Sequence, residues 1–252
     1  MIAYTLRDPF TLMTSIWGEA VKNGRTRPFP DHAARQLKDP ARSESLNPLK
    51  ELEPILDHPK LRLSVLDYDA TRRSGDDIYT AFCRDILGVD GMRPALDKSK
   101  NLSLPIEITD YLRALAEKID FDPKASHVMY SRLFTACHDQ ADIDRIVAAM
   151  QAAGPDYRRT VSLDRNAGWY ATLEADLVAR LGPRIHPMPV EGKLFGRDPL
   201  DVVTYDMERL ATRPEIGNLL DQSAGKMKAG RVPWTKTRFW RAWRYVQRTL
   251  GF

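Results

Sequence analysis

The sequence predicts an α/β fold built on a parallel sheet covered by helices. In residues 1–118, short apolar segments rich in β-forming residues alternate with longer segments of helical periodicity, which gives the order strand, helix, strand, helix. The composition agrees with this class. The 43% hydrophobic and 29% charged residues are typical of a globular protein, and 252 residues suffice for one large core or two smaller ones.

The first predicted strand covers residues 1–7, which are β-rich and apolar, and we expect it to be buried. Asp8 and Pro9 then start a helix, because proline is favoured in the first helical turn. This helix extends to about residue 24 with one apolar stripe. The stripe consists of Phe10, Met13, Ile16, Trp17 and Val21.

The remaining elements follow from periodicity and turn residues. In the first half they are helices at 31–38 and 48–56, a strand at 61–66, a helix at 76–88, a loop at 91–104 and a helix at 106–118. In the second half they are strands at 127–130, 160–163 and Ile185, and helices at 140–153, 166–181, 198–211 and 236–250. A seam near 120–124 predicts two domains, 1–120 and 121–252, the second an α/β or mostly helical extension.

Cysteine and histidine usage limits the class of protein. Cys83 and Cys137 are too few for a disulfide framework and lack a Cys-x-x-Cys spacing, so we expect a cytoplasmic protein. No window of 18 apolar residues predicts a membrane span. The five histidines show no metal-ligand spacing, so no metal is expected.

The basic residues are concentrated at the C-terminus. The net charge is +4, yet eight basic residues and no acidic ones follow Asp221, which predicts an anionic partner or a solubilising tail. Residues 236–252 combine an aromatic stripe with four arginines, a pattern that fits a helix lying on an anionic membrane surface. Packing of this stripe against the protein's own core is the alternative. No nucleic acid is expected, because no recognised binding motif accompanies the charge.

One constellation near the N-terminus suits an anion. Arg7 ends the first strand, the chain turns at Asp8-Pro9, and Ser15 lies about two turns along the following helix. The carboxyl end of a strand in an open α/β sheet is the usual place for a ligand, and a guanidinium with a hydroxyl suits a phosphate monoester. The alternative is a capping arginine with a serine on a polar helix face.

This constellation resembles the second nucleotide-binding element of the PAPS-dependent sulfotransferases, a P-loop family, in their bacterial carbohydrate-type branch. In that family an arginine at a strand end and a serine eight residues later hold the 3′-phosphate of 3′-phosphoadenosine 5′-phosphosulfate (PAPS), and Arg7 and Ser15 have this spacing. Further matches follow in the family's order. They are the flanks Tyr4–Leu6 and Ile16–Gly24, the strand Leu61–Asp69, the segment Asp77–Val89 and the element Asn101–Leu104.

The resemblance covers residues 1–118 and departs from the family at the start. The family begins with a Lys- and Gly-containing loop that holds the 5′-phosphosulfate at a helix N-terminus, and none precedes Met1. We therefore expect an incomplete, N-terminally truncated sulfotransferase-like sheet whose catalytic residues are unknown. Three explanations stay open: a mis-assigned start codon, a degenerate remnant, and replacement of the loop by a downstream segment.

The downstream segment is Gly225–Pro233, which loosely resembles the basic loop with which carbohydrate sulfotransferases cover the nucleotide. Its candidate nucleotide-binding residues are Lys228, Gly230 and Arg231. Lysine and arginine supply charge for phosphates, and glycine lets the backbone approach closely. A flexible basic linker before the last helix is the alternative.

The resemblance implies transfer of a sulfuryl group from PAPS to a carbohydrate or similar hydroxyl acceptor, with PAPS and its product PAP as co-substrates. Asp67 and Asp69, at the end of the second strand, are candidates for binding acceptor hydroxyls, the alternative being turn and helix-cap roles. Two other functions remain open. One is a non-catalytic scaffold at the inner membrane surface in polysaccharide assembly, and the other is a glycosyltransferase-like enzyme with its site in residues 125–220.

Overall fold

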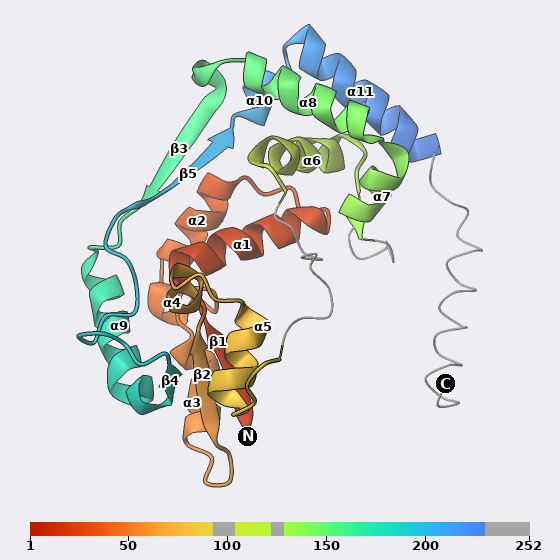
Figure 1. Ribbon diagram of the computed structural model, residues 1–252. Coiled ribbons are helices and arrows are strands. Elements are labelled where there is room, and N and C mark those ends of the chain that lie inside the picture. The colour runs from red at the N-terminus through yellow and green to blue at the C-terminus, as the bar shows by residue number, and fades with distance from the viewer. Residues whose placement is uncertain (93–103, 122–128, 230–252) are drawn as a thin grey trace. The chain divides into compact units, whose positions relative to one another are not determined.

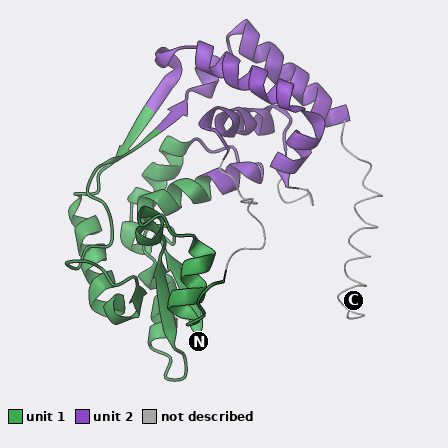
Figure 2. Ribbon diagram, in the orientation of Figure 1, with its two compact units in different colours: residues 1–17, 29–103, 160–202 green, residues 18–28, 104–159, 203–252 purple. Residues whose placement is uncertain are grey.

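The computed structural model describes residues 1–92, 104–121 and 129–229 (Figure 1), and the statements below refer to these residues. The chain divides into two compact units (Figure 2). Unit 1 comprises residues 1–17, 29–103 and 160–202, and unit 2 comprises residues 18–28, 104–159 and 203–252. Each unit is assembled from three separate segments of the chain.

A three-stranded parallel sheet belongs to unit 1. Its strand order is β1 (Ile2–Leu6), β2 (Leu63–Asp67), β4 (Ile185–His186). The predicted α/β class with parallel strands is therefore confirmed. The expectation that β1 is buried is wrong, because β1 is the edge strand: among the described strands only β2 pairs with it, and Ala3 and Thr5 are exposed.

Helices follow the strands of unit 1. They are α1 (Pro9–Lys22), whose last turn belongs to unit 2, α2 (Phe29–Leu37), α3 (Leu49–Leu56), α4 (Tyr68–Arg73), α5 (Ile78–Ala81) and α9 (Gly168–Leu181). α1 begins at the predicted proline. Its apolar stripe is narrower than predicted, because Ile16 lies at the margin of the stripe and is 40% exposed. The helix predicted at 76–88 is the short α5 followed by a π-helical turn at Phe82–Ile86.

Aromatic side chains form part of the core of unit 1. Phe10 of α1 and Tyr170 of α9 are both fully buried, with ring centroids 5.1 Å apart. Phe195 also contacts Tyr170, with ring centroids 5.8 Å apart in an edge-on arrangement. Burial of Tyr170 brings its hydroxyl into the interior, where it needs a hydrogen-bond partner.

Unit 2 is mainly helical. Its helices are α6 (Ile106–Lys118), α7 (Tyr130–Cys137), α8 (Gln140–Ala152), α10 (Met207–Leu210) and α11 (Pro214–Ala229). Inside it, Ser223 Oγ lies 2.8 Å from Tyr111 Oη and 2.9 Å from His138 Nε2. Burial lowers the pKa of His138, so the ring is neutral, donates from Nδ1 to the Phe134 carbonyl and accepts from Ser223.

The second half of the chain both confirms and corrects the predicted elements. The helices expected at 140–153 and 166–181 are α8 and α9, and the strand expected at 160–163 is part of β3 (Arg158–Leu163). The helix expected at 198–211 is instead the strand β5 (Leu200–Tyr205), paired with β3, followed by α10. β-Branched residues favour this strand, in which Val202 and Thr204 are buried and Val203 is exposed.

One further strand is not formed as predicted. Of the segment 127–130, Tyr130 begins the helix α7, while residues 127 and 128 lie outside the described part of the chain. Tyr130 is fully buried, and its hydroxyl donates to the Leu112 carbonyl at 3.1 Å. This contact with α6 is a tertiary interaction that the short apolar run did not reveal.

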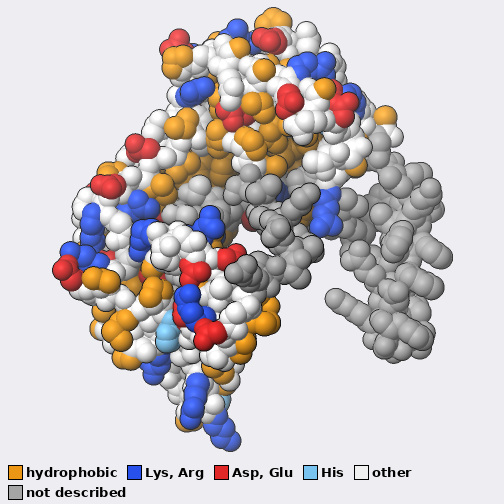
Figure 3. Space-filling model, in the orientation of Figure 1, with side chains coloured by type: hydrophobic (Ala, Val, Ile, Leu, Met, Phe, Trp, Pro, Cys, Tyr) orange, Lys and Arg blue, Asp and Glu red, His pale blue; other side chains and the backbone are white. Residues whose placement is uncertain are grey.

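Charges of both signs are interspersed over the face that Figure 3 shows, rather than gathered into a patch of one sign. None of the described helices combines the length and the apolar character needed to cross a membrane. The helix predicted at 236–250, with the basic stripe proposed for a membrane surface, lies outside the described residues.

Candidate functional site

The carboxyl edge of the parallel sheet in unit 1 gathers the polar residues that the sequence singled out. Arg7 and Asp8 follow β1, and Tyr68 and Asp69 follow β2. The two strand ends lie side by side, because Leu6 of β1 is in register with Asp67 of β2. This is the edge at which open α/β sheets bind ligands.

Arg7 is held by an aromatic ring instead of a carboxylate. Its guanidinium carbon lies 4.3 Å from the centroid of the Tyr68 ring, a cation–π contact. Its Nε atom is buried without a hydrogen-bond partner, and Arg7 makes no ion pair with any described residue. A buried donor without a partner costs about 1–3 kcal/mol, so an anion that accepted this hydrogen bond would be favoured here.

Ser15 lies in the second turn of α1, six residues after the helix begins, and is half-buried. No hydrogen bond joins its hydroxyl to Arg7, whose guanidinium lies over Tyr68. The structure therefore places both residues in unit 1, on either side of the turn at Asp8-Pro9. It shows no direct contact between their side chains.

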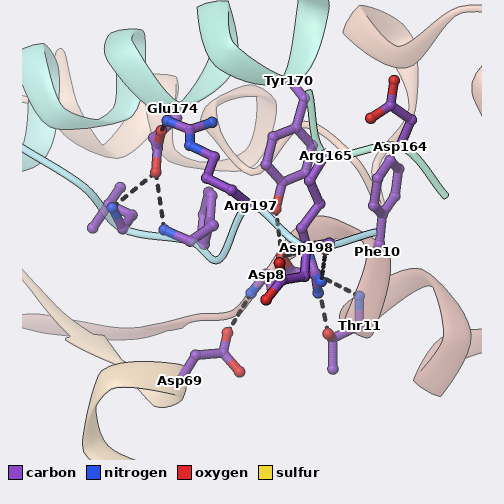
Figure 4. Close-up of polar contacts among 12 residues, drawn as sticks. Asp8, Phe10, Thr11, Asp69, Asp164, Arg165, Tyr170, Glu174, Arg197 and Asp198 are labelled. Carbon is purple, nitrogen blue, oxygen red and sulfur yellow. Dashed lines mark hydrogen bonds and ion pairs between the residues drawn. The ribbon is translucent and has the colours of Figure 1, made fainter. Parts of the chain in front are cut away.

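Asp8 lies at the centre of a buried network (Figure 4) and is 3% exposed. Its Oδ1 accepts hydrogen bonds from the Thr11 backbone N–H at 2.8 Å and the Thr11 hydroxyl at 3.0 Å, which caps the start of α1. Its Oδ2 accepts from Arg165 Nε at 2.9 Å and from the Tyr170 hydroxyl. Burial alone would raise the pKa of Asp8, but the hydrogen bonds from Arg165 and Tyr170 lower it below the ordinary value.

This network determines which residue pairs with the carboxylate of Asp8 at the edge of the sheet. Asp8 is adjacent to Arg7 in the sequence, yet its carboxylate pairs with Arg165 at 2.9 Å. Arg165 also donates from Nη1 to the Asp198 carbonyl at 2.7 Å, which fixes its position. The negative charge of Asp8 is therefore neutralised by Arg165, whereas Arg7 pairs with no carboxylate of the described residues.

Asp67 and Asp69 have the structural roles that the sequence left open. Asp67 Oδ1 accepts from the Ala70 backbone N–H at 2.9 Å and caps α4. Burial, and secondarily the charge of Asp69, raises the pKa of Asp67. Asp69 Oδ2 accepts the backbone N–H of Asp8 and so links the ends of β1 and β2. Both carboxylates thus bind backbone groups, as expected for turn and cap residues.

A second buried carboxylate stabilises the chain around this site. Glu174 of α9 accepts the backbone N–H groups of Leu194 and Phe195, each at 2.9 Å, and pairs with Arg197 (Figure 4). Glu174 is 3% exposed, so these contacts compensate its burial. It fixes the segment that leads to Asp198, which in turn holds Arg165.

The first residues of the downstream segment 225–233 lie in a helix. Residues 225–229 form the last turn of α11 and not a loop, because Met227 is buried and the exposed Gly225 is tolerated in the helix. Lys228 is exposed on this helix in unit 2, whereas Arg7 belongs to unit 1. Gly230 and Arg231 lie outside the described residues.

Sequence reasoning missed Arg165 and Tyr170 entirely. Arg165 lies 157 residues from Asp8 in the sequence, and no spacing or motif connects them.

Within residues 1–92, 104–121 and 129–229, no group of three or more His, Cys, Asp or Glu side chains is arranged to hold a metal ion. No family model, no curated protein and no solved structure matches the chain.

Proposed function

We propose that unit 1 binds the 3′-phosphate of a PAPS-type nucleotide through Arg7 and Ser15, as part of a sulfotransferase-like activity. The observation that carries this proposal is Arg7, a guanidinium at the carboxyl edge of a parallel sheet with a buried, unpartnered Nε and no carboxylate partner among the described residues. The neighbouring Asp8 is neutralised by Arg165 and does not compete for it. The P-loop assignment of the sheet is part of the same proposal.

The role of these residues is positioning. Tyr68 holds the guanidinium in one plane, so that its N–H groups present a fixed fork to a phosphate. In the transfer, the acceptor oxygen forms a bond to sulfur while the bond from sulfur to the phosphate oxygen of PAPS breaks, and the acceptor proton passes to a base. Arg7 and Ser15 would act at the opposite end of the nucleotide and contribute orientation and binding energy. A carbohydrate or similar hydroxyl compound is the proposed acceptor.

Substitution of Arg7 tests the proposal. We expect Arg7→Gln to weaken binding of 3′,5′-adenosine bisphosphate (PAP) by about 10–100-fold, because a hydrogen bond to a charged group is worth about 1.5–3 kcal/mol. Ser15→Ala should weaken it by about tenfold, the lower end of the same range, because the hydroxyl also donates to a charged phosphate oxygen. Isothermal titration calorimetry on the purified chain measures both effects.

Two controls make the result specific. Adenosine 5′-monophosphate lacks the 3′-phosphate, and its affinity should be the same for wild type and Arg7→Gln. Arg42→Gln removes an arginine of unit 1 whose side chain is 88% exposed, and it should leave PAP binding unchanged. The nucleotide assignment is wrong if wild type gives no binding heat with PAP, or if Arg7→Gln binds PAP as tightly as wild type.

A further inference from the structure

Unit 2 contains arginines that lie on tyrosine rings instead of pairing with carboxylates. The guanidinium carbons of Arg209 and Arg213 lie 5.3 Å and 5.5 Å from the centroid of the Tyr157 ring. Neither arginine makes an ion pair with a residue in the described part of the chain. In the same region, Arg159 pairs with Asp206. Among the described residues, no carboxylate therefore pairs with the two guanidiniums that contact the Tyr157 ring.

The local fold brings these residues together. Tyr157 ends a 3₁₀ turn at the start of β3, and its carbonyl accepts the backbone N–H of Asp206 at 2.8 Å. This contact places α10, which carries Arg209, beside the turn. Arg213 directly precedes α11.

Each guanidinium is anchored a second time, by a backbone carbonyl. Arg209 Nη1 donates to the Asp156 carbonyl at 3.3 Å, and Arg213 Nη1 donates to the Ala153 carbonyl at 3.2 Å. A guanidinium has five N–H donors, and in each arginine only Nη1 donates to a described residue. Restraint by ring and carbonyl also reduces the side-chain entropy that binding would cost.

A helix terminus adds to the preference for an anion. α11 is 16 residues long and begins at Pro214, next to Arg213. The N-terminus of a helix carries a partial positive charge and unpaired N–H groups. Arg209 is exposed and Arg213 half-exposed, so both are accessible to a ligand in unit 2.

We propose that Arg209 and Arg213, mounted on Tyr157, bind a sulfate or phosphate ester group of a small molecule. Both guanidiniums contact the same tyrosine ring, and guanidinium forks match the oxygens of a tetrahedral dianion. The exposed residues Asp156 and Glu208 directly precede Tyr157 and Arg209 in the sequence, and their negative charges disfavour an extended run of phosphates more than a single anionic group. A single-stranded nucleic acid also needs free aromatic faces, whereas Tyr157 is stacked with arginine and Tyr205 is 4% exposed. The site uses none of the residues proposed to bind PAPS.

The test is an NMR titration of the arginine Nε–H signals with four probes at constant ionic strength. The probes are inorganic sulfate, inorganic phosphate, galactose 6-sulfate and glucose 6-phosphate, with sodium chloride as the reference. We expect saturable shifts of the Arg209 and Arg213 signals, with at least one ester binding more tightly than its inorganic anion. Arg209→Gln/Arg213→Gln should weaken that binding by about tenfold or more.

Two further variants separate charge from geometry. Arg145→Gln removes an exposed arginine of unit 2 that pairs with Asp142, and it should bind like wild type. Tyr157→Leu keeps both charges but removes the ring, and it should weaken binding by about threefold. If the double glutamine variant does not fold, Arg209→Lys/Arg213→Lys replaces it, since lysine keeps the charge but loses the fork. Shifts that do not saturate, equal affinity in the arginine variants, or binding of inorganic anions alone would overturn the proposal.

Discussion

Replacing Asp8 with alanine is expected to lower the free energy of unfolding of unit 1 by about 3–5 kcal/mol, because removal of one partner leaves a buried charge uncompensated. The partner is Arg165, whose side chain is only 13% exposed and which would lose its Nε acceptor. The buried Tyr170 hydroxyl would lose its acceptor as well, and the cap at the Thr11 N–H would be removed. All three hydrogen bonds are accepted by the carboxylate of Asp8, so one substitution removes them together.

Urea unfolding followed by circular dichroism measures the magnitude, and hydrogen exchange of peptides from α1 and α9 locates it. The matched control is Glu53→Ala, which removes an exposed ion pair with Arg180 in the same unit at 2.6 Å. That control should cost at most about 1 kcal/mol, because exposed pairs are screened by solvent. A loss below 1 kcal/mol for Asp8→Ala would show that the buried network does not form in solution.

The pH dependence of this effect has a definite sign. Because the pKa of Asp8 is lowered in the folded state, its contribution is fully present above the ordinary carboxyl pKa of 3.8 and is lost as the pH falls through the lower, folded value. The difference between wild type and Asp8→Ala should therefore be constant from neutral pH to about pH 5 and should shrink below pH 4.

The network also clarifies the proposed anion site. The sequence Arg7-Asp8 suggests mutual neutralisation, since the two charges are adjacent. In the structure Asp8 is directed to Arg165 and Arg7 to Tyr68. The positive charge available for a phosphate thus depends on an arginine contributed by a distant segment of unit 1. Arg165 therefore contributes to the stability of unit 1 and, in our proposal, also keeps Arg7 available for a phosphate.

Local patterns in the sequence predicted most of the strands and long helices. The apolar β-rich runs at β1 and β2 and the periodicity of α1, α6, α8 and α9 are properties of a few neighbouring residues. The edge position of β1 was not predictable in this way, because it depends on which strands pair with it. The prediction of a helix over 198–211 is wrong, because the β-branched residues 202–204 favour the strand β5.

The candidate site was predictable only in part, for the same reason. Arg7 and Asp8 were identified from their place after a strand, but their partners depend on tertiary contacts that leave no trace in local spacing. A different error concerns the segment that begins at Gly225, for which glycine and the basic residues predicted a loop although residues 225–229 belong to the helix α11. Glycine in a helix costs only about 1 kcal/mol relative to alanine, and burial of Met227 within unit 2 compensates for this cost.

A second buried ion pair, in unit 2, leads to the other large expected effect. Asp110 and Arg113 of α6 are 1% and 4% exposed, with Arg113 Nε 3.4 Å from Asp110 Oδ1. Asp110 Oδ2 also accepts the backbone N–H of Tyr205 at 2.7 Å. Asp110→Ala leaves Arg113 without its carboxylate, so we expect a loss of about 3–5 kcal/mol in the free energy of unfolding of unit 2 at pH 7.

The pH dependence of this loss should be opposite to that of Asp8→Ala. Burial raises the pKa of Asp110 to about 6, and the charge of Arg113 offsets only part of this rise. For a group whose pKa is raised in the folded state, the pH-dependent part of its stabilisation is fully present below the unfolded pKa of 3.8 and is lost as the pH rises through about 6. The difference between wild type and Asp110→Ala should therefore be larger at pH 5 than at pH 7.

This paired comparison removes the contribution of His138. Because the pKa of His138 is lowered in the folded state, unit 2 loses stability as the pH falls below 6.5. This loss is the same in wild type and in Asp110→Ala, so it cancels in the difference between their free energies of unfolding. Asp110→Asn, which keeps an acceptor for the Tyr205 N–H, should lose less stability than Asp110→Ala. Asp221→Ala, which removes the exposed pair with Lys118, serves as the control and should cost at most about 1 kcal/mol at either pH. The prediction is contradicted if the difference in the free energy of unfolding between wild type and Asp110→Ala stays constant or increases from pH 5 to pH 7. Asp110 would then be ionised over this whole range, and its charge would be better compensated than its burial indicates.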